Sequence, residues 1–152
     1  MKYINVQKHN TSCGPIAIMN TIKWLGGSIS YDYIDMFRAF SWSQENGTDA
    51  LSLSNTLKSF NIKYNLTSHP TVKDIEKVLK RGNACILLYV WYFEGKSGAH
   101  YVFIDEDSGD YFRAMNFTCD GWNIAPKFVL GKWFRSSKRW GDYRPIVWEI
   151  TK

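Results

Sequence analysis

The chain has few cysteines, no long apolar run and no repeated or low-complexity segment. Each absence excludes a class of protein. Three cysteines leave one over under any disulfide pairing, and no two are spaced as the CxxC pair of a metal or redox site. No stretch reaches the roughly 18 apolar residues of a transmembrane helix, and residues 1–5 lack the apolar core of a signal peptide. We therefore expect a cytoplasmic protein with no membrane span and no metal.

The bulk composition is that of a folded globular chain. Its 152 residues can bury one core but are too few for two ordinary domains, so a single domain over residues 1–152 is expected. Hydrophobic residues make up 45% and charged residues 22%, which is typical of globular proteins. The formal net charge of +5 attracts anionic partners, but it is too small to establish nucleic-acid binding.

Hydrophobic periodicity predicts helices in the first half of the chain and strands in the second. Cap and stop residues place the helices at Gly14–Leu25, at Tyr31–Phe40, from a cap at Thr48 or Asp49 to Phe60, and from a cap at Thr71 to Lys80. The later segments are expected to be strands at Ala84–Phe93, Ala99–Ile104, Asp110–Phe117 and Ile146–Ile150, a mobile loop at Glu94–Gly98, and a short helix or irregular segment at Phe128–Phe134. This order predicts an α+β fold in which N-terminal helices pack on a C-terminal antiparallel sheet.

Residues far apart in this layout form a pattern that suggests nucleophilic catalysis. Cys13 stands where the first helix begins, and the helix dipole and unpaired amide groups there favour a thiolate over a thiol. His100 opens a predicted strand, and its imidazole beside the sulfur would complete a nucleophile–base pair. Asn116 lies across the predicted hairpin and would orient that imidazole, as in the Cys-His-Asn arrangement of papain-like proteases.

Gln7, six residues before Cys13, is the natural candidate for an oxyanion hole. Its side-chain amide and the backbone N–H of Cys13 could hold the developing negative oxygen, and one such donor is typically worth about 10²–10³ in rate. The acidic residues nearest to His100 in sequence belong to a predicted turn that would face away from it. These residues are Asp105, Glu106, Asp107 and Asp110. Asn116 is therefore preferred as the third member of the triad.

These residues and their spacing resemble the bacteriocin-processing leader peptidases. That family consists of papain-like cysteine peptidase domains that cut after a double glycine and are often fused to ABC transporters. The similar positions are Gln7, Cys13-Gly14-Pro15, His100-Tyr101-Val102 and Asn116, with a Gly-Thr stretch at Gly47-Thr48 before a helix. The similarity extends over roughly residues 5 to 118, about three quarters of the chain. It implies a papain-like fold, a peptide or protein substrate and no cofactor.

The sequence departs from the family pattern at two positions. Ser12 precedes the nucleophile where the peptidases commonly carry aspartate, and Asn116 stands where they usually carry aspartate. In addition, no transporter segment follows before Lys152. The resemblance is therefore to a stand-alone, divergent member. The function that it implies is cleavage of a peptide or isopeptide amide through Cys13, His100, Asn116 and Gln7.

Two other functions remain open from the sequence. A peptidase scaffold can serve as a binding module that recognises a peptide or protein without cleaving it. The stretch from Lys127 to Arg144 mixes basic and aromatic residues, a composition that can follow a phosphate backbone and stack on bases. Such a stretch is more often a solvated rim whose aromatic residues belong to the core.

Overall fold

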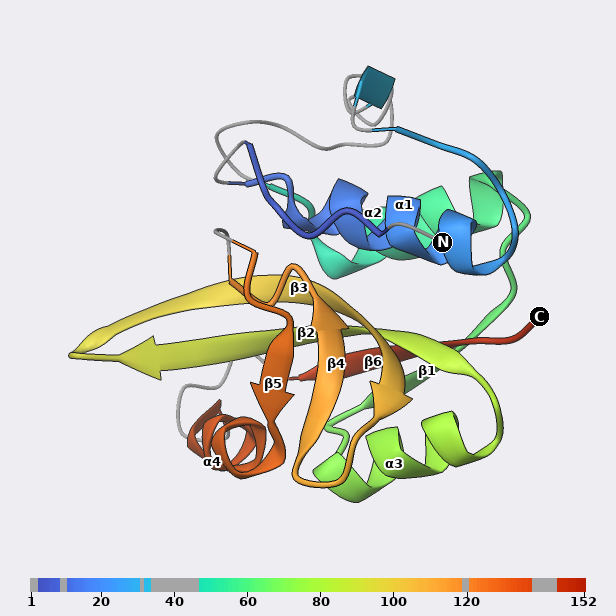
Figure 1. Cartoon of the computed structure of the whole chain (residues 1–152). Coiled ribbons are helices and arrows are strands. Elements are labelled where there is room, and N and C mark those ends of the chain that lie inside the picture. The colour runs from blue at the N-terminus through green and yellow to red at the C-terminus, as the bar shows by residue number, and fades with distance from the viewer. Residues whose placement is uncertain (1–2, 9–10, 31, 34–46, 119–120, 138–144) are drawn as a thin grey trace.

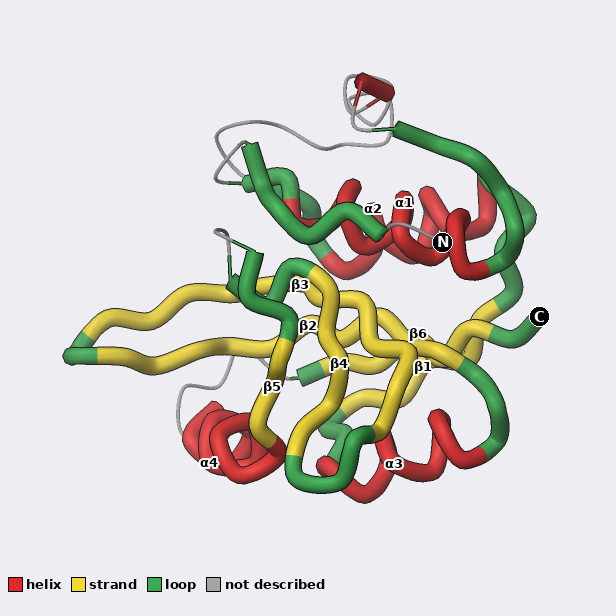
Figure 2. The backbone as a smooth tube through the Cα atoms, viewed as in Figure 1, coloured by secondary structure: helices red, strands yellow, loops and turns green. Residues whose placement is uncertain are grey.

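The computed structural model describes residues 3–8, 11–30, 32–33, 47–118, 121–137 and 145–152. In these residues a six-stranded antiparallel sheet lies between two helices above it and two below (Figure 1; Figure 2). The helices are α1 (Cys13–Trp24), α2 (Ala50–Ser59), α3 (Val72–Lys80) and α4 (Lys127–Ser137). The strands are β1 (Tyr64–Ser68), β2 (Ala84–Phe93), β3 (Lys96–Asp107), β4 (Tyr111–Met115), β5 (Ile124–Pro126) and β6 (Ile146–Ile150). The expected α+β fold is confirmed.

Three of the predicted helices form within a residue or two of the expected bounds. Asp49 caps α2 by accepting a hydrogen bond of 2.8 Å from the backbone N–H of Ser52. Thr71 and Asp74 form a reciprocal capping box at the start of α3. The helix predicted at Tyr31–Phe40 lies almost wholly outside the described residues. The segment Phe128–Phe134, for which a short helix or an irregular segment is expected, lies within the helix α4, which runs from Lys127 to Ser137.

The strands follow the order β1-β6-β2-β3-β4-β5, and β2 and β3 form the long central hairpin (Figure 1). The prediction of a mobile loop at Glu94–Gly98 is wrong, because the pairing between β2 and β3 continues to Phe93 and Lys96. Only Glu94 and Gly95 form the turn, and both have the positive φ, 49° and 77°, that a two-residue hairpin turn of type I′ requires.

The strand order places β6 inside the sheet, between β1 and β2. β1 and the three-residue β5 form the two edges, and neither was predicted. β3 extends from Lys96 to Asp107, past both expected bounds, whereas β4 ends at Met115.

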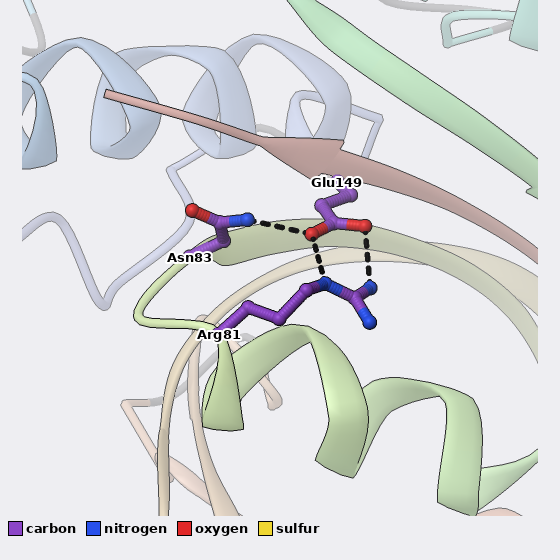
Figure 3. A network of polar contacts seen from close by, with 3 residues as sticks. All are labelled: Arg81, Asn83 and Glu149. Atoms are coloured by element: carbon purple, nitrogen blue, oxygen red, sulfur yellow. Dashed lines mark hydrogen bonds and ion pairs between the residues drawn. The ribbon is translucent and has the colours of Figure 1, made fainter.

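The sheet has a hydrophobic core on each face, because neighbouring residues of a strand point to opposite sides. The side chains of Tyr101 and Phe103 pack with residues of α1 and α2, whereas Val102 and Ile104 pack with residues of α3 and α4. An ion pair fastens α3 to the sheet: Arg81 donates to both carboxylate oxygens of Glu149 in β6, at 2.7 and 3.0 Å (Figure 3). Asn83 donates to the same carboxylate (Figure 3). This scaffold holds the start of α1 and the start of β3 in place.

Candidate active site

His100 lies near the start of β3 with only 8% of its surface exposed. Its cross-strand partner is Tyr89 of β2, whose ring meets the imidazole edge-on at a centroid distance of 5.9 Å. Nε2 of His100 lies 2.6 Å from the main-chain carbonyl oxygen of Asn116. A carbonyl oxygen can only accept a hydrogen bond, so Nε2 carries the proton. In the neutral ring Nδ1 is then the basic nitrogen.

The surroundings of His100 favour this neutral ring. Burial lowers the pKa of His100 from its usual value near 6.5, and the hydrogen bond to Asn116 opposes that shift. Tyr89 in turn stacks on Trp133 of α4, with the two rings almost parallel at 6° and a centroid distance of 5.7 Å. The imidazole is therefore a desolvated, oriented base held between the sheet and an aromatic cluster.

Asn116 ends β4 in a left-handed conformation with φ of 65°, which asparagine tolerates better than most residues. Sequence reasoning expected its side chain to orient His100, and this detail is wrong. The main-chain carbonyl contacts the imidazole, while the side-chain Nδ2 donates a hydrogen bond of 3.0 Å to Oε1 of Gln7. Asn116 is 1% exposed, and its Oδ1 has no hydrogen-bond partner among the described residues. The loop therefore presents a carbonyl to His100 and an amide to Gln7.

Gln7 is thus linked to His100 through hydrogen bonds with Asn116. It lies in the segment that leads into α1, and the structure brings it to Asn116, 109 residues later in the chain. Because Oε1 of Gln7 is held by Asn116, the NH₂ end of the same amide is turned away from Asn116. That orientation presents a hydrogen-bond donor, which is the chemical type that an oxyanion hole needs.

Cys13 is the first residue of α1 and is partly buried. It forms no disulfide bond. The start of α1 differs from the starts of α2 and α3 in that Ser12 makes no side-chain cap hydrogen bond. Like α2, α1 has no acidic residue in its first turn. A negative group at this position would meet the positive end of the helix dipole with no neighbouring carboxylate in that turn. Such a helix end is suited to stabilising a thiolate.

Tyr101, the residue that follows His100, lies close enough to Cys13 to feel its charge. Burial raises the pKa of Tyr101, and the charge of the Cys13 thiolate adds to that shift. Tyr101 donates a hydrogen bond of 3.0 Å to the carbonyl oxygen of Thr48. Its side chain lies on the α1 face of β3, opposite to the face on which His100 meets Tyr89. The approach of the Cys13 sulfur to the His100 imidazole therefore remains a prediction.

The acidic residues considered as alternatives to Asn116 have other partners. Asp105 pairs with Arg113 at 2.6 Å, and Asp107 pairs with Lys127 at 2.7 Å. Both residues lie in the last part of β3 and not in the turn where they were expected.

Part of the described basic and aromatic stretch serves the fold, whereas Phe128, Lys132 and Arg135 are exposed. Lys127 binds the carboxylates of Glu76 and Asp107, and Trp133 donates a hydrogen bond to the carbonyl oxygen of Tyr92. Phe134 is buried in the lower core. Residues 138–144, which carry Lys138, Arg139, Trp140 and Arg144, lie outside the described residues. The described residues thus favour a structural role over a nucleic-acid surface.

In the described residues, no three His, Cys, Asp or Glu side chains come close enough to hold a metal ion. None of the helices in the same part of the chain is long and apolar enough to cross a membrane.

Comparison with solved structures shows the fold of the C39 peptidases. The peptidase domain of Streptococcus ComA, a bifunctional ABC transporter involved in a quorum-sensing pathway, has a TM-score of 0.69 at 14% identity. The match covers 99% of this chain and 100% of that domain. A C39-like peptidase from Bacillus anthracis has a TM-score of 0.64 at 10% identity and covers 99% of this chain and 94% of its own. No family model matches the sequence, and no curated protein matches it either.

Proposed function

We propose that this protein is a cysteine peptidase-type hydrolase that cleaves a peptide or isopeptide amide bond. The observation that carries the proposal is the hydrogen bond from His100 Nε2 to the Asn116 carbonyl, in a chain with the fold of the C39 peptidases. That bond fixes the proton on one ring nitrogen and leaves the other as a base.

In the proposed reaction, Cys13 is the nucleophile. Its sulfur attacks the carbonyl carbon of the substrate while the thiol proton passes to Nδ1 of His100. The carbonyl oxygen becomes an oxyanion, which accepts hydrogen bonds from the side-chain amide of Gln7 and the backbone N–H of Cys13. The carbon–nitrogen bond then breaks, and the imidazolium of His100 gives its proton to the leaving amine.

The second half of the reaction regenerates the enzyme. Water attacks the thioester as its proton passes to His100, and the sulfur–carbon bond breaks to release the carboxylic acid. His100 returns the proton to the Cys13 sulfur. Throughout both steps the Nε2 proton stays on the ring and remains hydrogen-bonded to the Asn116 carbonyl, so Asn116 orients the ring without touching the substrate. No cofactor takes part in this scheme.

The main test compares the wild type with Cys13→Ala on a library of peptides. We expect the substitution to lower turnover by a factor on the order of 10⁴ or more, because loss of the nucleophile removes the covalent pathway. The folded structure should survive, because alanine is smaller than cysteine and is a good helix former. Circular dichroism and thermal unfolding are the controls for the fold. A Cys13→Ala protein that cleaves as fast as the wild type would refute the proposal.

Thiol labelling separates a peptidase from a binding module on the same scaffold. Cys85 is the internal control, because it is fully buried in β2 and burial raises its pKa. We expect iodoacetamide near pH 6 to modify Cys13 at least about 100-fold faster than Cys85, since alkylation requires an accessible thiolate. Peptide mapping by mass spectrometry assigns the modified residue. Equally slow labelling of the two thiols, together with peptide binding without cleavage, would favour the binding module.

A further inference from the structure

Asn5 lies two residues before Gln7, and its side chain contacts the main chain at two positions, Asn116 and Gly121. Its Oδ1 accepts a hydrogen bond of 2.7 Å from the backbone N–H of Asn116. Its Nδ2 donates to the carbonyl oxygen of Gly121. One amide therefore joins two points that are 111 and 116 residues away along the chain.

This contact restrains the residue whose carbonyl contacts His100. The N–H of Asn116 points to Asn5 while its carbonyl points to Nε2 of His100, so both main-chain polar groups of one residue are used. The φ of 65° at Asn116 is a conformation that a non-glycine residue keeps only when its surroundings hold it. The Asn5 side chain supplies one of those restraints. Without it Asn116 loses one of the contacts that hold its conformation, and its carbonyl turns away from the imidazole more easily.

Asn5 is itself held by the helix that carries Cys13. The preceding residue, Ile4, makes two hydrogen bonds with the side chain of Asn20 in α1: its N–H donates at 2.7 Å and its carbonyl accepts at 2.8 Å. Asn20 is fully buried. A continuous set of contacts therefore runs from α1 through Ile4 and Asn5 to Asn116 and His100. It links the element that begins with the nucleophile to the group that orients the base.

We propose that Asn5 is a positioning residue that holds His100 in its Nε2–H tautomer through the main chain of Asn116. The catalytic consequence rests on the proposed peptidase function, but the tautomer does not. Asn5 fixes which nitrogen of the imidazole is the base and where that nitrogen stands relative to α1. It acts through another residue and touches no reacting atom.

The closing experiment reads the tautomer directly, by two-dimensional ¹H–¹⁵N NMR of the histidine rings in the full chain. We expect the wild type to show a single Nε2–H tautomer for His100, with a proton that exchanges slowly with water. The substitution His100→Gln removes that signal and so assigns it among the three histidines. Asn5→Ala should give a mixture of tautomers and fast exchange. Asn65→Ala, an exposed asparagine in β1, is the matched control and should leave the signal unchanged.

A second variant keeps the test decisive if Asn5→Ala does not fold. Asn5→Asp retains an oxygen that accepts from the N–H of Asn116, so we expect it to keep the Nε2–H signal. With a peptide substrate, Asn5→Ala should lower kcat by about 10- to 100-fold with little change in KM, and Asn5→Asp should recover most of that loss. A wild-type signal in Asn5→Ala, or its loss in a folded Asn5→Asp, would overturn the proposal. A protein that shows the expected tautomers but cleaves no peptide would refute the peptidase function alone.

Discussion

The two sides of the candidate site are built by different means. On the thiol side, Cys13 stands at a helix start that has no side-chain cap and no acidic residue in its first turn, and Thr48 and Tyr101 pack nearby. On the imidazole side, His100 donates a hydrogen bond to the main-chain carbonyl of Asn116, and Asn116 is held in turn by Asn5 and Gln7. One side relies on a helix dipole and close packing, and the other relies on individual hydrogen bonds.

The difference matches what each group needs in the proposed reaction. A thiolate needs a positive electrostatic environment, which a helix end supplies without any particular side chain. An imidazole that accepts and returns a proton needs one tautomer and one orientation, which only a directional contact supplies. The thiol side should therefore be sensitive to a change of volume, and the imidazole side to a change of main-chain geometry.

The largest effect is expected from added volume on the thiol side. A Cβ atom at Gly14 would lie 2.8 Å from Oγ1 and 2.9 Å from Cβ of Thr48, so the start of α1 or the chain at Thr48 must shift. We expect Gly14→Ala to lower the free energy of unfolding by about 1–3 kcal/mol and to reduce turnover. Urea unfolding measures the first quantity.

Gly131 in the middle of α4 is the matched control for that change. A Cβ atom there would make only ordinary contacts, at 3.5 Å from Arg135 and 3.7 Å from Val72. Gly131→Ala should therefore stabilise the protein by about 0.5–1 kcal/mol, the usual preference of a helix interior for alanine. If Gly14→Ala is stabilising as well, the thiol side is not closely packed and this part of the comparison fails.

A smaller effect is expected from the main chain on the imidazole side. Glycine adopts the left-handed conformation of Asn116 without strain, whereas alanine does not. Both substitutions remove the side chain that contacts Gln7, so they differ only in how easily they keep the carbonyl in place. Asn116→Gly should be about 1 kcal/mol more stable than Asn116→Ala and should turn over substrate faster. Equal activity in the two variants would show that the side chain, not the carbonyl, is what the site needs.

The smallest expected effect is on the pH dependence of stability, to which His100 on the imidazole side contributes. Because burial lowers the pKa of His100 in the folded state, the unfolded chain binds a proton at this residue more readily than the folded protein. The resulting stabilisation is complete above pH 6.5 and is lost as the pH falls from there towards the lower pKa of the folded state. Urea midpoints between pH 5 and pH 8 should fall less steeply with acid in His100→Gln than in the wild type. Parallel curves would show that the imidazole is not buried as a neutral ring.

The elements that could be predicted from the sequence are those whose hydrophobic pattern or cap residues clearly indicate a helix or a strand. The helix after Thr71 and the strand at Ala84–Phe93 are examples, since one has a capping box and the other is continuously apolar. The two missed strands lack both signals. β1 is an edge strand whose last four residues are exposed, and β5 has three residues and includes a proline. At the edge of a sheet, pairing with a neighbour stabilises a segment whose own sequence shows no strand pattern.

The candidate site was predictable in its residues but not in its hydrogen bonds. Chemical type and spacing identified Gln7, Cys13, His100 and Asn116, and hydrogen bonds join Asn116 to His100 and to Gln7. The catalytic roles of all four residues stay predictions. The carbonyl of Asn116 could not be foreseen as the partner of His100, because every residue has a carbonyl and only the conformation aims it. Asn5 was missed for a similar reason, since its partners are two main-chain groups more than a hundred residues away.

The position of β6 within the sheet has a consequence for how the protein is made. β6 separates β1 from β2, and in the described sheet β1 pairs with β6 alone. During synthesis on the ribosome, residues 64–68 therefore have no strand to pair with until residues 146–150 have been made. Meanwhile the polar edge of β2 that β6 later covers is open to other chains. Nascent chains halted before Pro145 should consequently be substrates for chaperones, and the finished polypeptide should not be.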